Sequence, residues 1–285
     1  MIATTGFFDG VHLGHRLVIE RLVSLAHERG DESLVVTFWP HPRAVLQDGA
    51  RELRLLTTLE EKKALLSGLG VSRIEVLDFS RSFAALSAEE YLREVLRDRF
   101  GVTTLLVGYD NRLGSDRLTA GALAPVATQL GIELIELPPY QTISSTKIRK
   151  SLEEGDIASA TSMLGYGYSL QGVVVAGNRL GRTIGFPTAN MKLYEPLKLV
   201  PGRGVYVVEA EVLGQKYRGM TNIGLRPTVG GTSTTIETHI LDFDEDIYGL
   251  PLRITFLRRL RDEIHFPSLD ALKAQLEMDR EACRT

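Results

Sequence analysis

Short apolar runs in the first half of the chain alternate with segments whose apolar side chains recur at helical spacing. The runs are rich in β-branched residues and span Ile2 to Thr5, Leu34 to Phe38, Ile74 to Phe79, Thr104 to Val107 and Ile132 to Leu137. After the first run, Val18, Leu22 and Leu25 fall on one face of a helix. Strands that alternate with helices predict βαβ units, so we expect an α/β domain built on a parallel sheet.

Several helices of this half have recognisable ends. Two pairs of residues have the capping-box spacing that opens a helix, Thr58 with Glu61 and Ser87 with Glu90. Prolines at 138 and 139 interrupt the pattern, and two helical segments follow, around 146–154 and 157–164. We expect these two helices to close the first domain and to lead into the second.

The second half of the chain changes to strand patterns without helices between them. Runs rich in Val and Tyr, separated by Gly, Pro and Asn, span Leu170 to Ala176, Val205 to Leu213, Lys216 to Ile223, Thr234 to Phe243 and Leu252 to Leu257. This spacing favours an antiparallel β-barrel or sandwich. Ser268 is expected to cap a final amphipathic helix. We therefore predict two domains, 1–166 and 167–285.

Composition limits the classes of partner. The chain has 285 residues, of which 33 are basic and 36 acidic, and no long run of either sign. This balance argues against nucleic acid or a membrane surface as partner and favours small molecules, while nothing specifies an oligomeric state. The single cysteine, Cys283, and the absence of a signal sequence or an apolar span predict a cytoplasmic protein.

The first motif with candidate chemistry follows the first predicted strand. It reads Gly6-Phe-Phe-Asp9-Gly-Val-His12-Leu-Gly14-His15 and ends where the first helix begins. A helix start offers free N–H groups to a phosphate, and two imidazoles beside a glycine could add hydrogen bonds to a triphosphate. The alternative is a pair of histidines that only cap the helix.

Two further motifs would lie at the same sheet edge. Ser145, Thr146 and Arg149 open the predicted helix after residue 144, where hydroxyls, a helix N-terminus and a cation suit a phosphate clamp. Asp110 lies in a glycine-flanked segment after the fourth strand. The alternatives are an ordinary Ser/Thr cap with solvated cations and a plain turn.

The third dense region lies in the second half. Gly177, Gly181 and Gly185 recur at four-residue intervals, a spacing that fits a backbone wrapped around phosphates but is weak evidence alone. Thr188 and Asn190 follow a proline and could offer oxygens to a hard cation such as Mg²⁺. Their alternative role is to stabilise the turn.

A carboxylate stands out on a later strand. Period two places Glu237 and His239 on the face opposite Ile236, Thr238 and Ile240. If Glu237 faces the barrel interior, it could act as a general base. The competing interpretation is an exposed edge carboxylate with the apolar residues turned inward.

Taken in order, these motifs resemble the bacterial bifunctional riboflavin kinase/FAD synthetases over essentially the whole chain. The resemblance rests on the following segments: Phe8 to His15, Pro40 to Arg43, Gly108 with Asp110, Ser144 to Arg149, Gly185 to Asn190, Asn222 to Gly224, Arg226 to Thr228 and Glu237 to His239. It implies a Rossmann-like nucleotidylyltransferase domain followed by a riboflavin kinase barrel. It further implies phosphorylation of riboflavin to FMN, and then transfer of AMP from a second ATP to FMN, with FAD and pyrophosphate as products.

The resemblance also implies roles for single residues. His12 and His15 would stabilise charge on ATP phosphates, with Gly6, Asp9, Gly14 and Asp110 around the nucleotide. Ser145, Thr146 and Arg149 would hold the leaving pyrophosphate. In the barrel, Gly181 and Gly185 would border ATP, Thr188 and Asn190 would bind Mg²⁺ and ATP, and Glu237 would deprotonate riboflavin. Arg261 and Phe266 match the segment near the flavin.

Three positions depart from the family pattern. Members commonly carry a small or polar residue where Phe7 stands, and an aromatic residue where Asn111 and Leu113 stand. One lost neutral hydrogen bond costs about 0.5–1.5 kcal/mol, so we expect FAD synthesis to survive. Relatives usually carry a leader before the first strand, so we expect either an earlier natural start than Met1 or a shortened first strand.

Three alternatives remain at this stage. The chain could keep only the kinase, with a degenerate first domain as scaffold, although the intact His12, His15 and Arg149 argue against this. It could be a small class I synthetase-like enzyme, although a lysine-rich loop and a basic surface are absent from the sequence. It could also be a non-catalytic flavin or nucleotide regulator, against which Asn190 and Glu237 argue.

Overall fold

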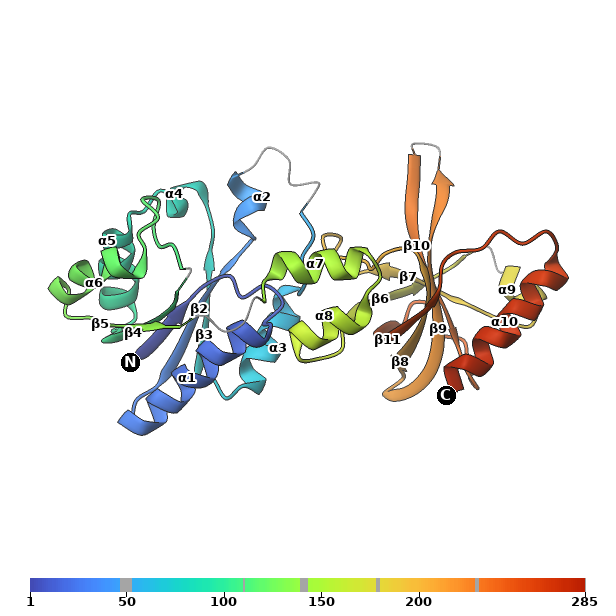
Figure 1. The fold of residues 1–285 in the computed structure, drawn as a ribbon, viewed down its shortest axis with the longest axis horizontal. Coiled ribbons are helices and arrows are strands. Elements are labelled where there is room, and N and C mark those ends of the chain that lie inside the picture. The colour runs from blue at the N-terminus through green and yellow to red at the C-terminus, as the bar shows by residue number, and fades with distance from the viewer. Residues whose placement is uncertain (47–52, 110, 139–142, 178–179, 229–230, 285) are drawn as a thin grey trace. The chain divides into compact units, whose positions relative to one another are not determined.

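The chain folds into two compact units, Met1–Ser145 and Thr146–Thr285, in a computed structural model (Figure 1). The structure describes residues 1–285 apart from 47–52, 110, 139–142, 178–179, 229–230 and 285. Each unit is built around its own sheet, and each is described separately below.

The first unit contains a five-stranded parallel sheet, as predicted. Its strands are β1 (Ile2–Thr5), β2 (Ser33–Trp39), β3 (Arg73–Asp78), β4 (Thr104–Gly108) and β5 (Glu133–Leu137), in the order β3-β2-β1-β4-β5. The strands β2 and β3 lie on one side of β1, and β4 and β5 lie on the other side. The strand order therefore reverses beside β1, and ligands of such sheets bind at the carboxyl ends of the strands at that point.

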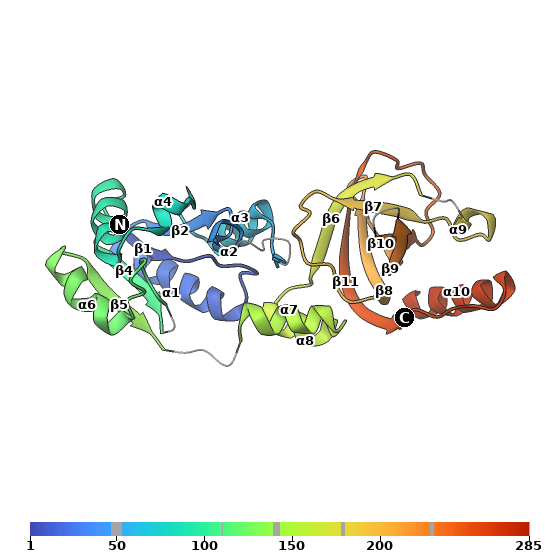
Figure 2. The same ribbon diagram turned by 90° about the horizontal axis from the view of Figure 1, so that it is seen from above.

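Helices cover both faces of this sheet (Figure 2). They are α1 (Leu13–Arg29), α2 (Pro42–Leu46), α3 (Leu59–Gly68), α4 (Arg81–Ala84), α5 (Ala88–Glu90), the π-helical segment η2 (Tyr91–Arg99) and α6 (Ala120–Gln129). Alternate residues of β1 enter different cores, because Ile2 packs with Leu22 of α1 and Ala3 packs with Leu92 of η2. Both predicted capping boxes are present, at the starts of α3 and α5.

The second unit contains a closed antiparallel barrel of six strands in the order β10-β7-β6-β11-β8-β9. The strands are β6 (Ser169–Val175), β7 (Ala189–Leu193), β8 (Gly204–Val212), β9 (Gln215–Thr228), β10 (Gly231–Ile240) and β11 (Pro251–Arg261). The short helix α9 (Leu180–Thr183) precedes β7, and α10 (Leu269–Arg284) ends the chain, with the Ser268 hydroxyl accepting a hydrogen bond from Ala271 N. The predicted barrel and final helix are confirmed. The sequence pattern missed β7, which has five residues and only alternate burial.

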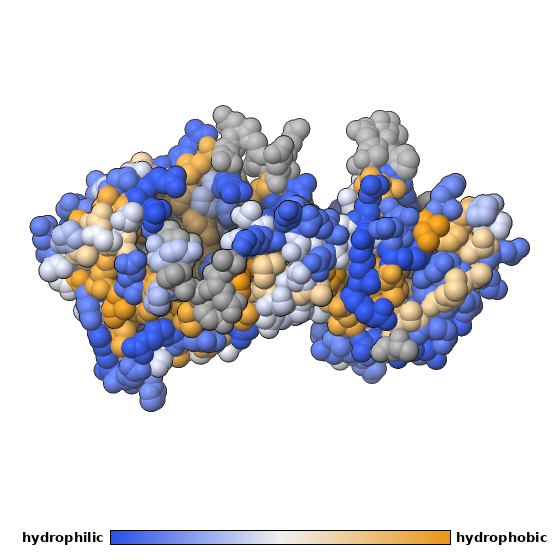
Figure 3. Space-filling view, in the orientation of Figure 1, coloured by the Kyte–Doolittle hydropathy of each residue, from blue (hydrophilic) through white to orange (hydrophobic). Residues whose placement is uncertain are grey.

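Polar and apolar residues are interspersed over the molecular face seen in Figure 3. Within the described part of the chain, none of the helices is both long and apolar enough to span a membrane.

The compact units divide after Ser145, whereas the sequence pattern predicts a domain boundary near residue 166. Two helices, α7 (Ser145–Glu153) and α8 (Ile157–Leu164), account for the difference. Gly202 N donates a hydrogen bond of 2.8 Å to Leu152 O, and a Cβ at Gly202 would approach Glu153 O to 2.3 Å. These contacts join the end of α7 to the loop before β8, so α7 packs with the barrel unit.

This packing predicts that the barrel is more stable with the two helices than without them. A fragment of residues 146–285 should melt at a higher temperature than a fragment of residues 167–285, because the shorter piece exposes the apolar surface that Leu152 and Leu164 bury. Thermal unfolding followed by circular dichroism measures both midpoints. Equal midpoints would mean that α7 and α8 add nothing to the barrel.

Candidate active sites

The turn between β1 and α1 brings two histidine rings together. His12 is the N-cap residue of α1, and its Nδ1 accepts a hydrogen bond of 3.3 Å from His15 N. The two imidazole rings stack with centroids 3.6 Å apart and planes 16° from parallel. Gly14 allows this stack, because a Cβ there would lie 3.3 Å from the His12 ring. The capping role is therefore real for His12, and it does not exclude a further role in ligand binding.

His15 occupies a position that suits an incoming ligand. Burial, with the nearby His12 and Lys62, holds the pKa of His15 well below 6.5, so its ring is neutral at pH 7. Its Nδ1 atom is buried and has no hydrogen-bond partner among the described residues. A buried polar atom without a partner is costly, and a bound ligand could supply the missing hydrogen bond.

Asp9 fixes the shape of the same turn. Its buried carboxylate accepts hydrogen bonds from Leu56 N at 3.0 Å and from Thr57 N at 3.0 Å. The Thr57 hydroxyl accepts in turn from Gly10 N at 3.1 Å. The described contacts of the Asp9 carboxylate therefore hold the turn, and its predicted part in ATP binding stays a prediction. Gly6 begins the turn, with its N–H donating to Val36 O at 3.1 Å.

The predicted phosphate clamp begins at the end of the first unit. Ser145 starts α7, and its hydroxyl donates a hydrogen bond of 3.0 Å to Asp9 O. Thr146 and Arg149 follow on the first turns of the same helix. Ser145, the last residue of the first unit, is thus hydrogen-bonded to the turn that carries the two histidines. Asp110 lies outside the described residues.

The three departures from the family pattern have different surroundings. Phe7 packs its ring against Phe38, His41 and Phe79, with centroid distances of 5.0, 5.3 and 5.6 Å. Asn111 donates from its side chain to Thr5 O at 3.4 Å, close to the end of β1. Leu113 is buried in the core of the first unit. Phe7 is therefore held by an aromatic cluster, and Leu113 contributes to packing.

A cavity of about 620 Å³ opens in the second unit between the barrel and α10. Its apolar wall includes Ile184, Phe186, Leu272 and Leu276. The predicted residues Gly181, Thr188, Glu237, Arg261 and Phe266 all line it as well. Glu237 therefore faces a cavity, although Ile236 and Ile240 of the same strand are buried, as the competing interpretation expected.

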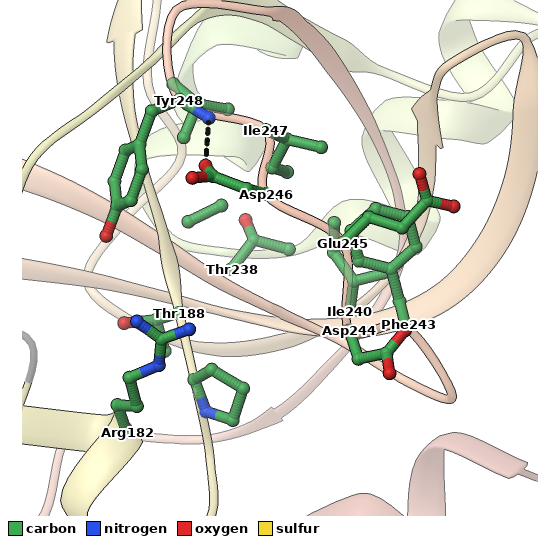
Figure 4. Close-up of a pocket in the computed structure, with 13 residues that line it drawn as sticks. Arg182, Thr188, Thr238, Ile240, Phe243, Asp244, Glu245, Asp246, Ile247 and Tyr248 are labelled. Atoms are coloured by element: carbon green, nitrogen blue, oxygen red, sulfur yellow. Dashed lines mark hydrogen bonds between the residues drawn. The ribbon is translucent and has the colours of Figure 1, made fainter.

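A second cavity, of about 300 Å³, also has Thr188 among its lining residues (Figure 4). Arg182 and Thr188 form one wall, and the acidic segment 244–246 with Tyr248 forms another. Tyr248 N donates to Asp246 Oδ1 at 3.1 Å, which fixes the end of this segment. Because Thr188 lines both cavities, it stands at the point where they approach each other.

Strand pairing places the candidate base beside the candidate cation ligand. Glu237 on β10 lies directly opposite Asn190 on β7. The Arg226 guanidinium lies 3.5 Å from Glu237 Oε1, and both side chains are partly exposed. Neighbouring Gly177 leaves room for the Asn190 amide, since a Cβ there would approach Asn190 Nδ2 to 2.3 Å. Arg226 lies in one of the segments that carry the family resemblance, but nothing in the sequence predicted its contact with Glu237.

The turn before β7 is fixed by a histidine on β10. His239 Nδ1 lies 2.8 Å from Pro187 O, and its ring meets Phe186 edge-on at 5.2 Å. Burial lowers the pKa of His239, which favours the neutral ring that this packing needs. Gly185 has a positive φ of 85°, which glycine adopts without strain. Thr188, which lines both cavities, is thereby held in place.

The donor atoms near Thr188 and Asn190 fit a hard cation. They are hydroxyl, amide and carboxylate oxygens, from Thr188, Asn190 and Glu237. Mg²⁺ prefers such oxygens, binds few protein groups and takes several ligands from substrate phosphates and water. The described residues contain no cluster of three or more His, Cys, Asp or Glu side chains that would suit a transition metal.

A buried ion pair joins α10 to the wall of the larger cavity. Asp279 accepts from Arg261 Nη2 at 2.7 Å and from Arg261 Nε at 3.0 Å, and its side chain is 5% exposed. Gln275 adds a hydrogen bond of 2.9 Å to the same carboxylate. The Arg261 guanidinium also lies 5.8 Å from the centre of the Phe266 ring. Sequence analysis identified Arg261 and Phe266 but missed Asp279, whose helical position looks like an ordinary surface charge.

The fold and the candidate sites together define a two-domain protein. Its first unit has the parallel α/β sheet typical of nucleotide-binding domains, and its second is a β-barrel with two cavities of small-molecule size. Comparison with known families gives two matches, FAD synthetase over residues 1–152 and riboflavin kinase over residues 164–285. The chain belongs to the bifunctional riboflavin kinase/FMN adenylyltransferase family.

Individual relatives support this assignment over the whole chain. The enzyme of that name from Listeria monocytogenes is 36% identical over 99% of this chain and 91% of its own, and the Escherichia coli one is 37% identical with the same coverage. A crystal structure from Streptococcus pneumoniae, titled a macrolide-efflux protein, is 34% identical with a TM-score of 0.93 and covers all of this chain and 93% of its own.

The ion pair between Asp279 and Arg261 predicts a local effect on α10. Asp279→Asn keeps the shape of the side chain but leaves the largely buried Arg261 cation without its partner, a change worth about 3 kcal/mol or more for a fully buried pair. Hydrogen exchange measured by mass spectrometry should become faster in peptides of α10. Asp242→Asn, which breaks an exposed pair with Arg284, is the control and should leave α10 unchanged. Equal exchange in both variants would contradict this role for Asp279.

Proposed function

We propose that this chain makes FAD from riboflavin in two steps, each carried out by one unit. The barrel unit phosphorylates riboflavin with ATP to give FMN. The α/β unit then transfers AMP from a second ATP to FMN and releases pyrophosphate. The observation that carries the proposal is the barrel site, where Thr188 lines two cavities and Glu237 lines one of them.

The two cavities suit the two substrates of the kinase step. The larger cavity has an apolar wall with an Arg at its edge, which fits a planar flavin ring with polar edges. The smaller one combines Phe243 and Tyr248 with the cation of Arg182, a set that suits the base and phosphates of ATP. With one substrate in each, the γ-phosphate and the riboflavin 5′-hydroxyl would meet beside Thr188.

Glu237 is positioned to take the proton in this step. Its carboxylate would accept the proton of the riboflavin 5′-hydroxyl as that oxygen forms a bond to the γ-phosphorus. The bond between the γ-phosphorus and the bridging oxygen breaks, and ADP leaves. Mg²⁺, held by Thr188 and Asn190 together with phosphate oxygens, would when bound neutralise charge on the transferred group.

The adenylyl transfer needs positioning more than proton transfer. The FMN phosphate is already a nucleophile, and one of its oxygens would bond to the α-phosphorus of ATP while pyrophosphate leaves. His12 and His15 at the start of α1 would hydrogen-bond the triphosphate, with the free Nδ1 of His15 as the candidate donor. Ser145, Thr146 and Arg149 would hold the departing pyrophosphate.

The phosphate-binding groups of the α/β unit support this step despite Phe7. The Phe7 ring lies among other aromatic rings, and the histidine pair and Ser145 keep the contacts described above. We therefore infer that the α/β unit is an enzyme and more than a scaffold. An enzyme that consumes ATP and supplies flavin nucleotides is expected in the cytoplasm, with small molecules as its partners.

The kinase assignment predicts a selective effect of Glu237→Gln. The variant keeps the shape of the side chain but cannot accept the proton, so FMN formation should fall by about 10²-fold or more. Adenylylation of added FMN should stay at the parent rate. Product separation by chromatography measures both, and Glu211→Gln on the exposed side of β8 is the matched control. Riboflavin phosphorylation at the parent rate in Glu237→Gln would remove Glu237 as the base.

The adenylyltransferase assignment predicts the reverse pattern for His12→Ala. Loss of a positioned donor should lower FAD formation from FMN and ATP by about 10²-fold, while the kinase activity of the same molecules stays unchanged. His27→Ala, near the exposed end of α1, is the control. A His12→Ala protein that makes FAD as fast as the parent would leave His12 only its role as a helix cap.

A further inference from the structure

A buried lysine lies beneath the turn that carries the two histidines. Lys62 belongs to the first turn of α3 and is only 5% exposed. Its ammonium donates hydrogen bonds to Thr37 Oγ1 at 3.0 Å, to Phe7 O at 3.1 Å and to Phe38 O at 3.4 Å. All three donors of the ammonium are thus used within the protein. Phe7 is the second residue after β1, and Thr37 and Phe38 lie near the end of β2.

This contact joins the carboxyl ends of β1 and β2, and β1 is also the strand beside which the order of the sheet reverses. Thr37 reinforces the link by donating from its hydroxyl to Phe7 O at 3.3 Å. The helix that carries Lys62 is itself attached to the turn, because Leu56 N and Thr57 N, just before α3, donate to Asp9. Lys62, Asp9 and the turn are therefore one connected unit.

A buried charged group is an unusual choice for a contact that only holds β1 and β2 together. An ammonium group loses much solvation when buried, and an apolar side chain can often brace two strands at less cost. Carbonyl and hydroxyl oxygens solvate this cation in part. The nearby carboxylate of Asp9 favours the charged form, but that carboxylate is already bound to main-chain N–H groups. The charge of Lys62 acts on the histidine pair, since Lys62 contributes, after burial and His12, to the low pKa of the His15 ring.

We propose that Lys62 is a positioning residue for adenylyl transfer, whose buried ammonium joins β1 to β2 and provides a fixed positive charge beneath the turn that receives the ATP phosphates. The inference rests on the function proposed for the α/β unit. Its physical basis is preorganisation: a cation held in place before the reaction stabilises negative charge without having to reorient.

The protonation of Lys62 gives this role a measurable signature. Burial lowers the pKa of the Lys62 ammonium to about 8, and Asp9 opposes part of that shift. The charged form predominates below this pH and is lost above it, so kcat/KM for ATP in FMN adenylylation should decline as pH rises through about 8. His15 remains neutral throughout that range, because its pKa lies well below 6.5, and so does not produce the decline.

The first test replaces the charge and keeps the stem. Lys62→Met should lower kcat/KM for ATP by about 10²-fold, as expected for a lost charge-stabilising group, and the alkaline decline should disappear. Riboflavin phosphorylation by the same molecules is the internal standard and should stay within about twofold. Lys63→Met, on the next position of α3 with an exposed side chain, makes the same charge change and should behave like the parent.

A second variant separates the charge from the bracing role. Lys62→Arg keeps a cation that does not lose its proton in this pH range, so its profile should stay flat where the parent declines. This variant decides the question if Lys62→Met fails to fold, which circular dichroism would reveal. Adenylylation by Lys62→Met within about threefold of the parent, or a profile of Lys62→Arg identical to that of the parent, overturns the inference. A parent protein that makes no FAD from FMN and ATP would instead overturn the proposed function of the α/β unit.

Discussion

The pairing of β7 with β10 is the contact on which the barrel site depends. It closes the barrel and places Asn190 directly opposite Glu237. The same contact brings the turn before β7 against β10, where His239 holds Pro187 and thereby Thr188. The candidate cation ligand, the candidate base and the residue that lines both cavities are therefore fixed by one strand pair. Phosphoryl transfer requires this kind of fixed geometry, because its catalysis is mostly positioning and charge stabilisation.

In the α/β unit the candidate site is also held in a fixed shape, but mainly by buried polar side chains rather than by one strand pair. The shape of the turn between β1 and α1 is set mainly by buried polar groups. Asp9 binds the main chain before α3, Lys62 binds the main chain at the ends of β1 and β2, and the Ser145 hydroxyl donates to Asp9 O. Buried polar groups of this kind stabilise a structure only when their hydrogen bonds are made, so each of them constrains the others. The stacked histidines sit on this support.

Much of the fold could be predicted from the sequence, because periodicity reports which face of each element is buried. The strands of the parallel sheet, both capping boxes and the final helix follow from local patterns. The strand β7 could not be predicted in this way, because its five residues, Ala189 to Leu193, follow a turn and contain no long apolar run. The sequence pattern predicts a boundary near residue 166 and the compact units divide after Ser145, since no local pattern tells which neighbour a linking helix packs against.

The candidate sites could be predicted where a motif lies on one continuous segment. The histidine pair, Thr188 with Asn190, and Glu237 are of this kind. Groups that act through distant partners were missed. Asp279 is 18 residues from Arg261 in the chain, and Lys62 is 55 residues from Phe7. Each looks like a common surface charge in the sequence, and only the folded chain reveals that it is buried and paired.

The most direct test of two chemistries in one chain is a time course with the intact protein, riboflavin, ATP and Mg²⁺. Products separated by chromatography should include FMN first and FAD later, at the expense of FMN. The amount of pyrophosphate should equal that of FAD, and the amount of ADP should equal that of FMN and FAD together. Accumulation of FMN with neither FAD nor pyrophosphate, or no phosphorylated flavin at all, would contradict the account.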